Sequence, residues 1–65
     1  MEHVLQAARE LGITVHISDN PRLAPFVTIT HGTHAVNQRL EPFEGKSLDH
    51  TKLMLTEMRR LAQNH

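Results

Sequence analysis

The fold is decided by residues 26–40, which read FVTITHGTHAVNQRL. Before the glycine, Val27 and Ile29 alternate with polar residues, and after it the apolar residues again fall at every second or fourth position. A period of two is typical of a strand with one buried face. Gly32 stands between the two runs and can adopt the positive φ of a tight turn. The stretch therefore predicts a β-hairpin whose loop has either two or four residues.

A helix and a third strand are predicted on the N-terminal side of the hairpin. The apolar residues of the helix share one stripe, which consists of Val4, Leu5, Ala8 and Leu11. Gly12 follows them, where a left-handed C-terminal cap is expected. From residue 13 to residue 17 apolar and polar side chains alternate, which predicts a strand with His16 facing solvent. Residues 18–25 collect turn formers and two prolines, and we expect them to connect this strand to the hairpin.

The C-terminal part predicts a second helix that begins after Ser47. The expected second arm of the hairpin, residues 33–40, is broken by residues 41–46, which include a proline and a glycine. Ser47 is a good N-cap, and Asp49 lies in the first turn, where the helix dipole favours an acid. The stripe expected to be buried runs through residue 62 and consists of Leu48, Thr51, Met54, Leu55, Met58, Leu61 and Ala62. Leu53 falls about 150° from the centre of that stripe, so we expect its side chain to be exposed.

The order helix, strand, strand, strand, helix predicts one small α+β domain over residues 1–65. The simplest arrangement of this α-β-β-β-α order is a three-stranded antiparallel sheet with both helices packed on one face. The opposite face is then polar and open to solvent. It consists of Thr14, His16, Thr28, Thr30, Ala35, Asn37 and Arg39.

Length and composition restrict the classes of function. A domain of 65 residues without cysteine has neither a disulfide nor a thiolate metal site, so self-association is an expected source of stability. Seven Lys and Arg balance seven Asp and Glu, which leaves little attraction to nucleic acid or to an anionic membrane. No apolar run approaches the roughly 18 residues of a membrane span, and the start lacks the pattern of a signal peptide. We therefore expect a cytoplasmic protein with no membrane partner.

Six histidines are the main concentration of potential chemistry, and His31 and His34 flank the glycine of the hairpin. A metal site needs three or four ligands, so His16, His50 or an acid would have to join these two. The chain has neither a Cys-x-x-Cys nor a His-Glu-x-x-His motif, and we expect no native metal site and no cofactor. The histidine content still raises the hypothesis of a metal or pH sensor.

The order of the elements resembles that of double-stranded-RNA-binding domains and of small HicA-type toxins that cleave messenger RNA. The resemblance covers topology and length. It implies an RNA-binding or RNA-cleaving domain in which His31 or His34 is the acid or base. The residues that would contact phosphate are Arg39, Arg59 and Arg60. At the start of the last helix the RNA-binding domains carry a lysine cluster, whereas residues 47–52 hold one lysine and one aspartate.

The hypothesis that needs no missing residues is a non-enzymatic interaction module. Such a module would regulate a larger protein by binding it, would be able to form a homodimer, and would have the small size common in bacterial and phage regulators. Its contact surface would be Leu53 with a charged rim around it, since a hydrophobic centre with a polar rim is the usual anatomy of an interface. The residues expected to bind the partner are Leu53, Asp49, Glu57, Arg60, His31 and His34.

We predict weak binding of random duplex DNA or RNA at physiological salt, with a small dependence of affinity on salt. The physical reason is a formal net charge of zero, with the basic residues spread over all segments. Fluorescence anisotropy titrations with unrelated duplexes measure this affinity. Submicromolar binding would contradict the prediction and would favour the RNA hypothesis.

Overall fold

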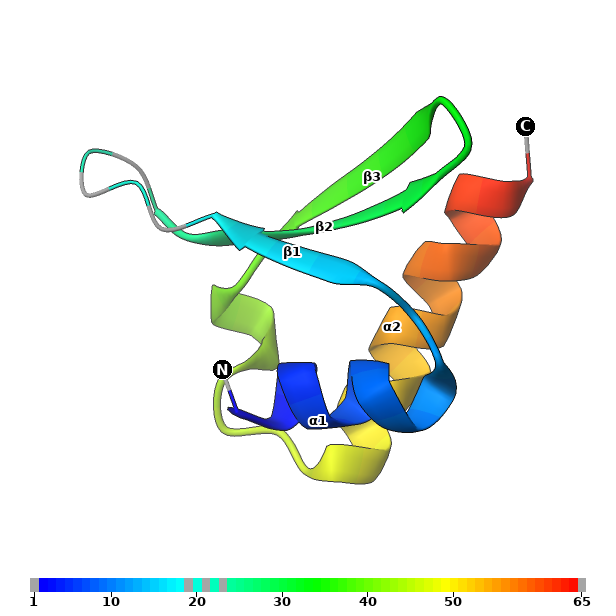
Figure 1. Ribbon diagram of the computed structural model, residues 1–65. Coiled ribbons are helices and arrows are strands. Elements are labelled where there is room, and N and C mark those ends of the chain that lie inside the picture. The colour runs from blue at the N-terminus through cyan, green and yellow to red at the C-terminus, as the bar shows by residue number, and fades with distance from the viewer. Residues whose placement is uncertain (1, 19, 21, 23, 65) are drawn as a thin grey trace.

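The structure is a computed structural model that describes residues 2–18, 20, 22 and 24–64. The elements in chain order are α1 (Glu2–Leu11), β1 (Val15–Ser18), β2 (Phe26–His31), β3 (His34–Arg39), the 3-10 helix η1 (Glu41–Phe43) and α2 (Leu48–Gln63). The predicted α-β-β-β-α fold is confirmed. Figure 1 shows α1 and α2 on the same side of a sheet whose other face is open.

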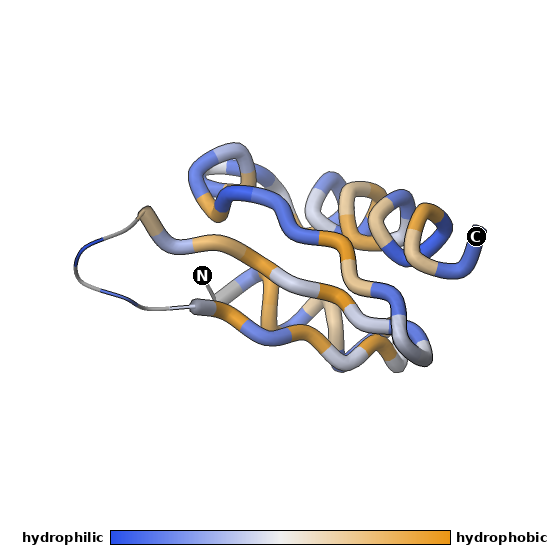
Figure 2. The backbone as a smooth tube through the Cα atoms, turned by 90° about the horizontal axis from the view of Figure 1, so that it is seen from above, coloured by the Kyte–Doolittle hydropathy of each residue, from blue (hydrophilic) through white to orange (hydrophobic). Residues whose placement is uncertain are grey.

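The sheet is an antiparallel meander in which β2 lies between β1 and β3. On the helix side of the sheet, Ile29 pairs with Val15 and with Val36. On the open side, the Thr28 hydroxyl donates to Oδ1 of its cross-strand partner Asn37 at 2.5 Å, which fixes the register from the polar face as well. Figure 2 shows hydrophobic and hydrophilic positions alternating along the strands, as the sequence predicts.

The hairpin closes with the pair His31 and His34, so its loop has two residues, Gly32 and Thr33. Gly32 has a φ of +63°, and the non-glycine residues that the structure describes all have negative φ. A positive φ at the first loop position alone is the requirement of a type II′ turn, whose twist matches that of the flanking strands. The structure thus selects the shorter of the two loops that the sequence allowed.

The chain leaves α1 through a Schellman motif at Gly12. Gly12 has a φ of +68°, its amide donates to the Arg9 carbonyl at 3.2 Å, and the Ile13 amide donates to the Ala8 carbonyl at 2.9 Å. The predicted cap is confirmed. The cap also uses Ile13, so β1 begins at Val15 and ends at Ser18 instead of spanning residues 13–17.

Two leucines that the sequence analysis placed on buried stripes are exposed. The side chain of Leu5 in α1 is 42% exposed and that of Leu61 in α2 is 46% exposed, whereas Ala7 is fully buried. The reason is that α1 packs closely on α2 with its small residues, which turns Ala7 inward and Leu5 outward. On α2 the stripe that is buried is narrower than predicted and consists of Thr51, Leu55, Met58 and Ala62.

The segment after β3 contributes to the core, which the sequence analysis missed. Leu40 was expected in the strand, but the strand ends at Arg39 and the Leu40 amide donates to the Pro25 carbonyl at 3.0 Å. η1 follows this contact, and its Phe43 is buried in the core with 3% of its surface exposed. The core cluster consists of Val4, Ala7, Ala8, Val27, Ile29, Leu40, Phe43, Leu55, Met58 and Ala62.

The start of α2 is capped as predicted. The Ser47 hydroxyl accepts a hydrogen bond from the His50 amide at 3.1 Å. The Thr51 hydroxyl donates to the Ser47 carbonyl at 2.9 Å, which satisfies a polar side chain that is fully buried. The cap therefore explains how a threonine can occupy the centre of the buried stripe.

The two phenylalanines are expected to differ in their contribution to stability. Phe43→Ala should lower the free energy of unfolding by about 3 kcal/mol or more, because it empties a fully packed position. Phe26→Ala should cost about 1 kcal/mol, because Phe26 is half-buried on the open face of the sheet. Urea denaturation of both variants measures the difference. Equal losses would show that η1 is not part of the core.

Candidate functional site

One face of α2 carries an exposed band of apolar and charged residues, here named the α2 stripe. The α2 stripe consists of Asp49, Leu53, Glu57, Arg60 and Leu61, all of which are exposed. The side chain of Leu53 is 70% exposed, which confirms the prediction made from helical spacing. Leu61 lies two turns further along the helix and adds a second apolar side chain that the sequence analysis had assigned to the core. The band therefore has two apolar positions where one was expected.

An ion pair joins the two charged residues that lie between these leucines. The Arg60 guanidinium donates to both carboxylate oxygens of Glu57, with 3.0 Å between Nε and Oε2. These hydrogen bonds lower the pKa of Glu57 and raise that of Arg60. Because the pair is exposed, it adds little to stability. Its consequence is geometric, since a bidentate pair holds two long side chains in one arrangement between Leu53 and Leu61.

The α2 stripe faces away from α1. On the side of α2 that meets α1, Lys52 donates to the Glu10 carboxylate at 2.6 Å. This hydrogen bond is the main cause of the lowered pKa of Glu10 and of the raised pKa of Lys52. Lys52 falls about 100° from Leu53 around the helix, so the contact with α1 leaves the α2 stripe uncovered.

The two hairpin histidines lie apart from the α2 stripe. His31 and His34 pair across the end of the hairpin, and both are exposed. Alternation from the buried Ile29 places His31 on the helix side of the sheet, beyond the end of the core. Within the described part of the chain, no three His, Asp or Glu side chains come together as a metal-binding group. The ligands that a metal site would need from His16 or His50 are thus not brought to this pair.

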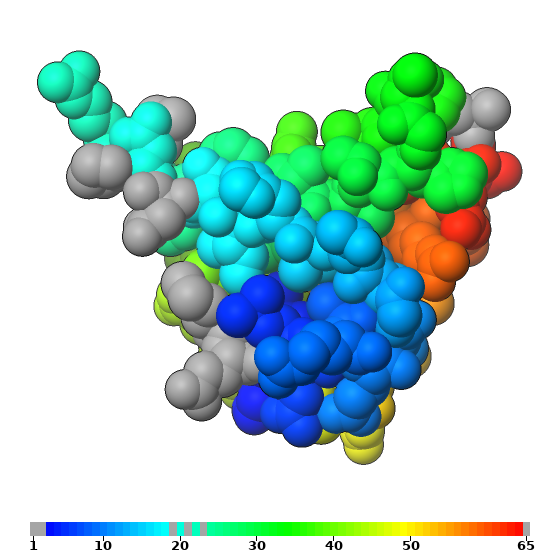
Figure 3. Space-filling view, in the orientation of Figure 1, coloured from blue at the N-terminus to red at the C-terminus, as the bar shows by residue number. Residues whose placement is uncertain are grey.

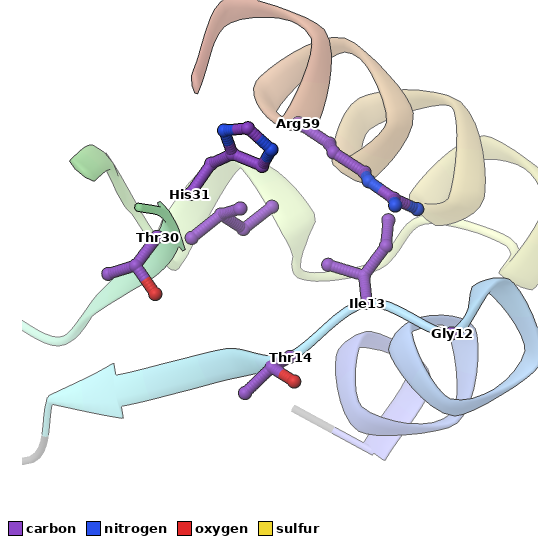
Figure 4. Close-up of a pocket in the computed structure, with 7 residues that line it drawn as sticks. Gly12, Ile13, Thr14, Thr30, His31 and Arg59 are labelled. Atoms are coloured by element: carbon purple, nitrogen blue, oxygen red, sulfur yellow. The ribbon is translucent and has the colours of Figure 1, made fainter. Parts of the chain in front are cut away.

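A pocket of about 180 Å³ lies between three parts of the chain: the end of β2, the segment that precedes β1, and α2. Its lining residues are Gly12, Ile13, Thr14, Ile29, Thr30, His31 and Arg59. Figure 4 shows the side chains of His31 and Arg59 approaching the same opening from β2 and from α2. In the space-filling view of Figure 3, the hairpin end (green) lies beside the C-terminal half of α2 (orange to red).

The structure divides the sequence-predicted residues between these two places. The α2 stripe holds Leu53, Asp49, Glu57 and Arg60, the pocket holds His31, and His34 lies at the hairpin end outside both. Arg59, which the RNA hypothesis grouped with His31, does share a pocket with it, whereas Arg60 is bound in its ion pair. Arg39 lies at the far end of β3, where it pairs with Phe26. The three arginines that were grouped together thus lie in three different environments.

Comparison of the chain with known protein families, curated proteins and solved structures found no match. Neither helix of the described chain is long and apolar enough to cross a membrane.

Stability should depend on pH through Glu10 and Glu57. The folded state lowers the pKa of both carboxyls below their ordinary value of 4.5, so each exposed ion pair contributes a small stabilisation above that pH. This contribution is lost as the pH falls through the lowered pKa. Thermal melts should therefore agree at pH 7.5 and 5.5 and should fall to lower temperature below about pH 4.5.

Glu10→Gln supplies the control for this pH dependence. It removes one of the two carboxyls, so its melting temperature should depend less on pH in the acid range than that of the unmodified chain. A large loss of stability already at pH 5.5 would contradict the prediction and would indicate a histidine contact that protonation breaks.

Proposed function

We propose that this chain is a non-enzymatic interaction module whose α2 stripe binds a second copy of the same chain. The observation that supports the proposal is the pair of exposed leucines, Leu53 at 70% and Leu61 at 46%, on one face of the longest helix. Fixed charges border both of them. A hydrophobic centre with a charged rim is the anatomy of a protein interface.

The spacing of the α2 stripe is self-complementary. Leu53 and Leu61 are eight residues apart, about 12 Å along the helix, and Glu57 lies halfway between them. A two-fold axis beside Glu57 would pack Leu53 against Leu61 of the partner subunit and repeat the same contact on the other side. Symmetric pairing of one patch with itself is the commonest form of dimer. Two antiparallel α2 helices would thus cover all four leucines.

The charges fit the same antiparallel arrangement. Asp49 lies in the first turn of α2 and Arg60 in the last, so antiparallel helices bring the acidic end of one copy near the basic end of the other. The opposed helix dipoles are favourable for the same reason. Each Glu57 carries its own Arg60, so the axis does not bring two unpaired carboxylates together.

The size of the helix limits the strength of this dimer. A helix of 16 residues is about 24 Å long. One helix packed on another covers less than the roughly 1,200–2,000 Å² of a standard stable interface. The proposal is therefore a weak dimer, with a dissociation constant in the micromolar range or above. Regulation of a larger protein, the other part of the hypothesis, would use the surfaces that this contact leaves open.

Sedimentation velocity over a concentration series tests the dimer. The unmodified chain should shift from monomer to dimer as its concentration rises towards the millimolar range. Leu53→Asp should remain a monomer at every concentration, because the dimer would bury two unpaired carboxylates. Its circular dichroism spectrum should be that of the unmodified chain, since Leu53 contributes little to the core.

Leu5→Asp is the matched control, because it places the same charge at another exposed leucine, on α1 and outside the α2 stripe. It should dimerise like the unmodified chain. Leu55→Asp reports on the fold, and it should unfold the chain because Leu55 is fully buried. A monomeric unmodified chain, or equal weakening by Leu5→Asp and Leu53→Asp, would overturn the proposal.

A further inference from the structure

We propose that the pocket between β1, β2 and α2 binds an oxyanion, the phosphate group of a small organic phosphate. The pocket forms where the two strands separate. The ladder between β1 and β2 ends at the pair Val15 and Ile29, and Thr14 and Thr30 lie beyond it. Gly12 adds no side chain on that side, and the space of about 180 Å³ is closed on the third side by Arg59. A phosphate and the atoms next to it fit a space of this size, since a water molecule takes roughly 30 Å³.

Arg59 is the main anion-binding group of the pocket. Its neighbours Lys52 and Arg60 are both engaged, in ion pairs with Glu10 and Glu57. Arg59 has no ion pair and no hydrogen bond with any residue that the structure describes. A guanidinium presents a planar set of donors that matches two oxygens of a phosphate. A guanidinium at the edge of a pocket that no described residue engages is therefore ready to bind such a group.

His31 is the second polar side chain that faces the opening. Figure 4 shows the His31 ring beside Arg59, whereas the side chains of Thr14 and Thr30, which line the pocket at the strand ends, are directed away from both. An imidazole can donate a hydrogen bond to a phosphate oxygen. Among the described residues that line the pocket there is no Asp or Glu. The electrostatic character of the pocket thus favours an anion and gives a cation no partner.

The rest of the lining indicates what carries the phosphate. Ile13 and Ile29 form an apolar wall next to the polar rim, since Ile29 belongs to the core and Ile13 packs against it. A small pocket with an apolar wall and a few convergent polar groups is typical of sites for small organic molecules. We therefore expect a monoester with an apolar or aromatic group to bind better than inorganic phosphate.

This site is independent of the proposed dimer. Arg59 and Leu53 are about 120° apart around α2, so the pocket and the α2 stripe occupy different sides of the helix. Occupation of one leaves the other uncovered. The failure of either proposal would leave the other unchanged.

Nuclear magnetic resonance titrations of the isotopically labelled chain test the pocket. The probes are inorganic phosphate, phenyl phosphate and a short single-stranded RNA without terminal phosphate. We expect the amide signals of Gly12, Thr14, Thr30 and His31 to move with phenyl phosphate. Arg59→Gln should weaken this binding by about tenfold, because it removes a charge-assisted pair of hydrogen bonds.

Arg60→Gln is the matched control, because it makes the same substitution at the neighbouring arginine, which points away from the pocket in its ion pair with Glu57. It should leave the affinity for phenyl phosphate within about twofold. If the RNA shifted the same signals equally, the pocket would still be a phosphate-binding site, but its ligand would be the backbone of a nucleic acid. No movement at these four amides, or equal weakening by both substitutions, would overturn the proposal.

Discussion

The structure depends on the one-sided burial of β2. Val27 and Ile29 are the two strand residues that are buried almost completely. Both belong to β2, the central strand, so reversing the two faces of this strand would expose them to solvent. A slip of one residue in the pairing would move Thr28 into the core and both aliphatic side chains into water. The apolar alternation of one short strand therefore fixes the register of the sheet, and the hydrogen bond from Thr28 to Asn37 supports the same register from the open face.

The register of β2 also determines where chemistry can occur. The next residue of β2 on the helix side after Ile29 is His31. Because β2 extends beyond the core, His31 is exposed although it lies on the same face as the buried Ile29. The Schellman motif at Gly12 moves the start of β1 to Val15, so the sheet has no β1 partner at that end. The pocket beside Arg59 thus forms where β2 extends beyond the start of β1 and Arg59 of α2 approaches the uncovered end.

Local signals in the sequence predicted most of the fold, and the positions that they missed depend on how the helices approach each other. The turn at Gly32 and the N-cap at Ser47 were predictable because each is decided by a few adjacent residues. Helical spacing also predicted the exposure of Leu53. Helical spacing gives only the angles between side chains around the helix axis. Which of these side chains face the core follows from the close contact of α1 with α2. Leu5 and Leu61 lie at the edges of their stripes, so this direction decides their exposure.

The pocket could not be predicted because it joins three segments that are far apart in the chain. Arg59 and Arg60 show the difference clearly, since both are arginines of the last turns of α2 and the helix dipole favours them equally. About 100° of rotation places one in an ion pair with Glu57 and the other beside His31. In a chain whose formal net charge is zero, no general field attracts anions, so a local guanidinium that no described residue engages, such as Arg59 beside the pocket, decides where one can bind. Charge balance over the whole sequence therefore disfavours a nucleic-acid coat without disfavouring a local phosphate site.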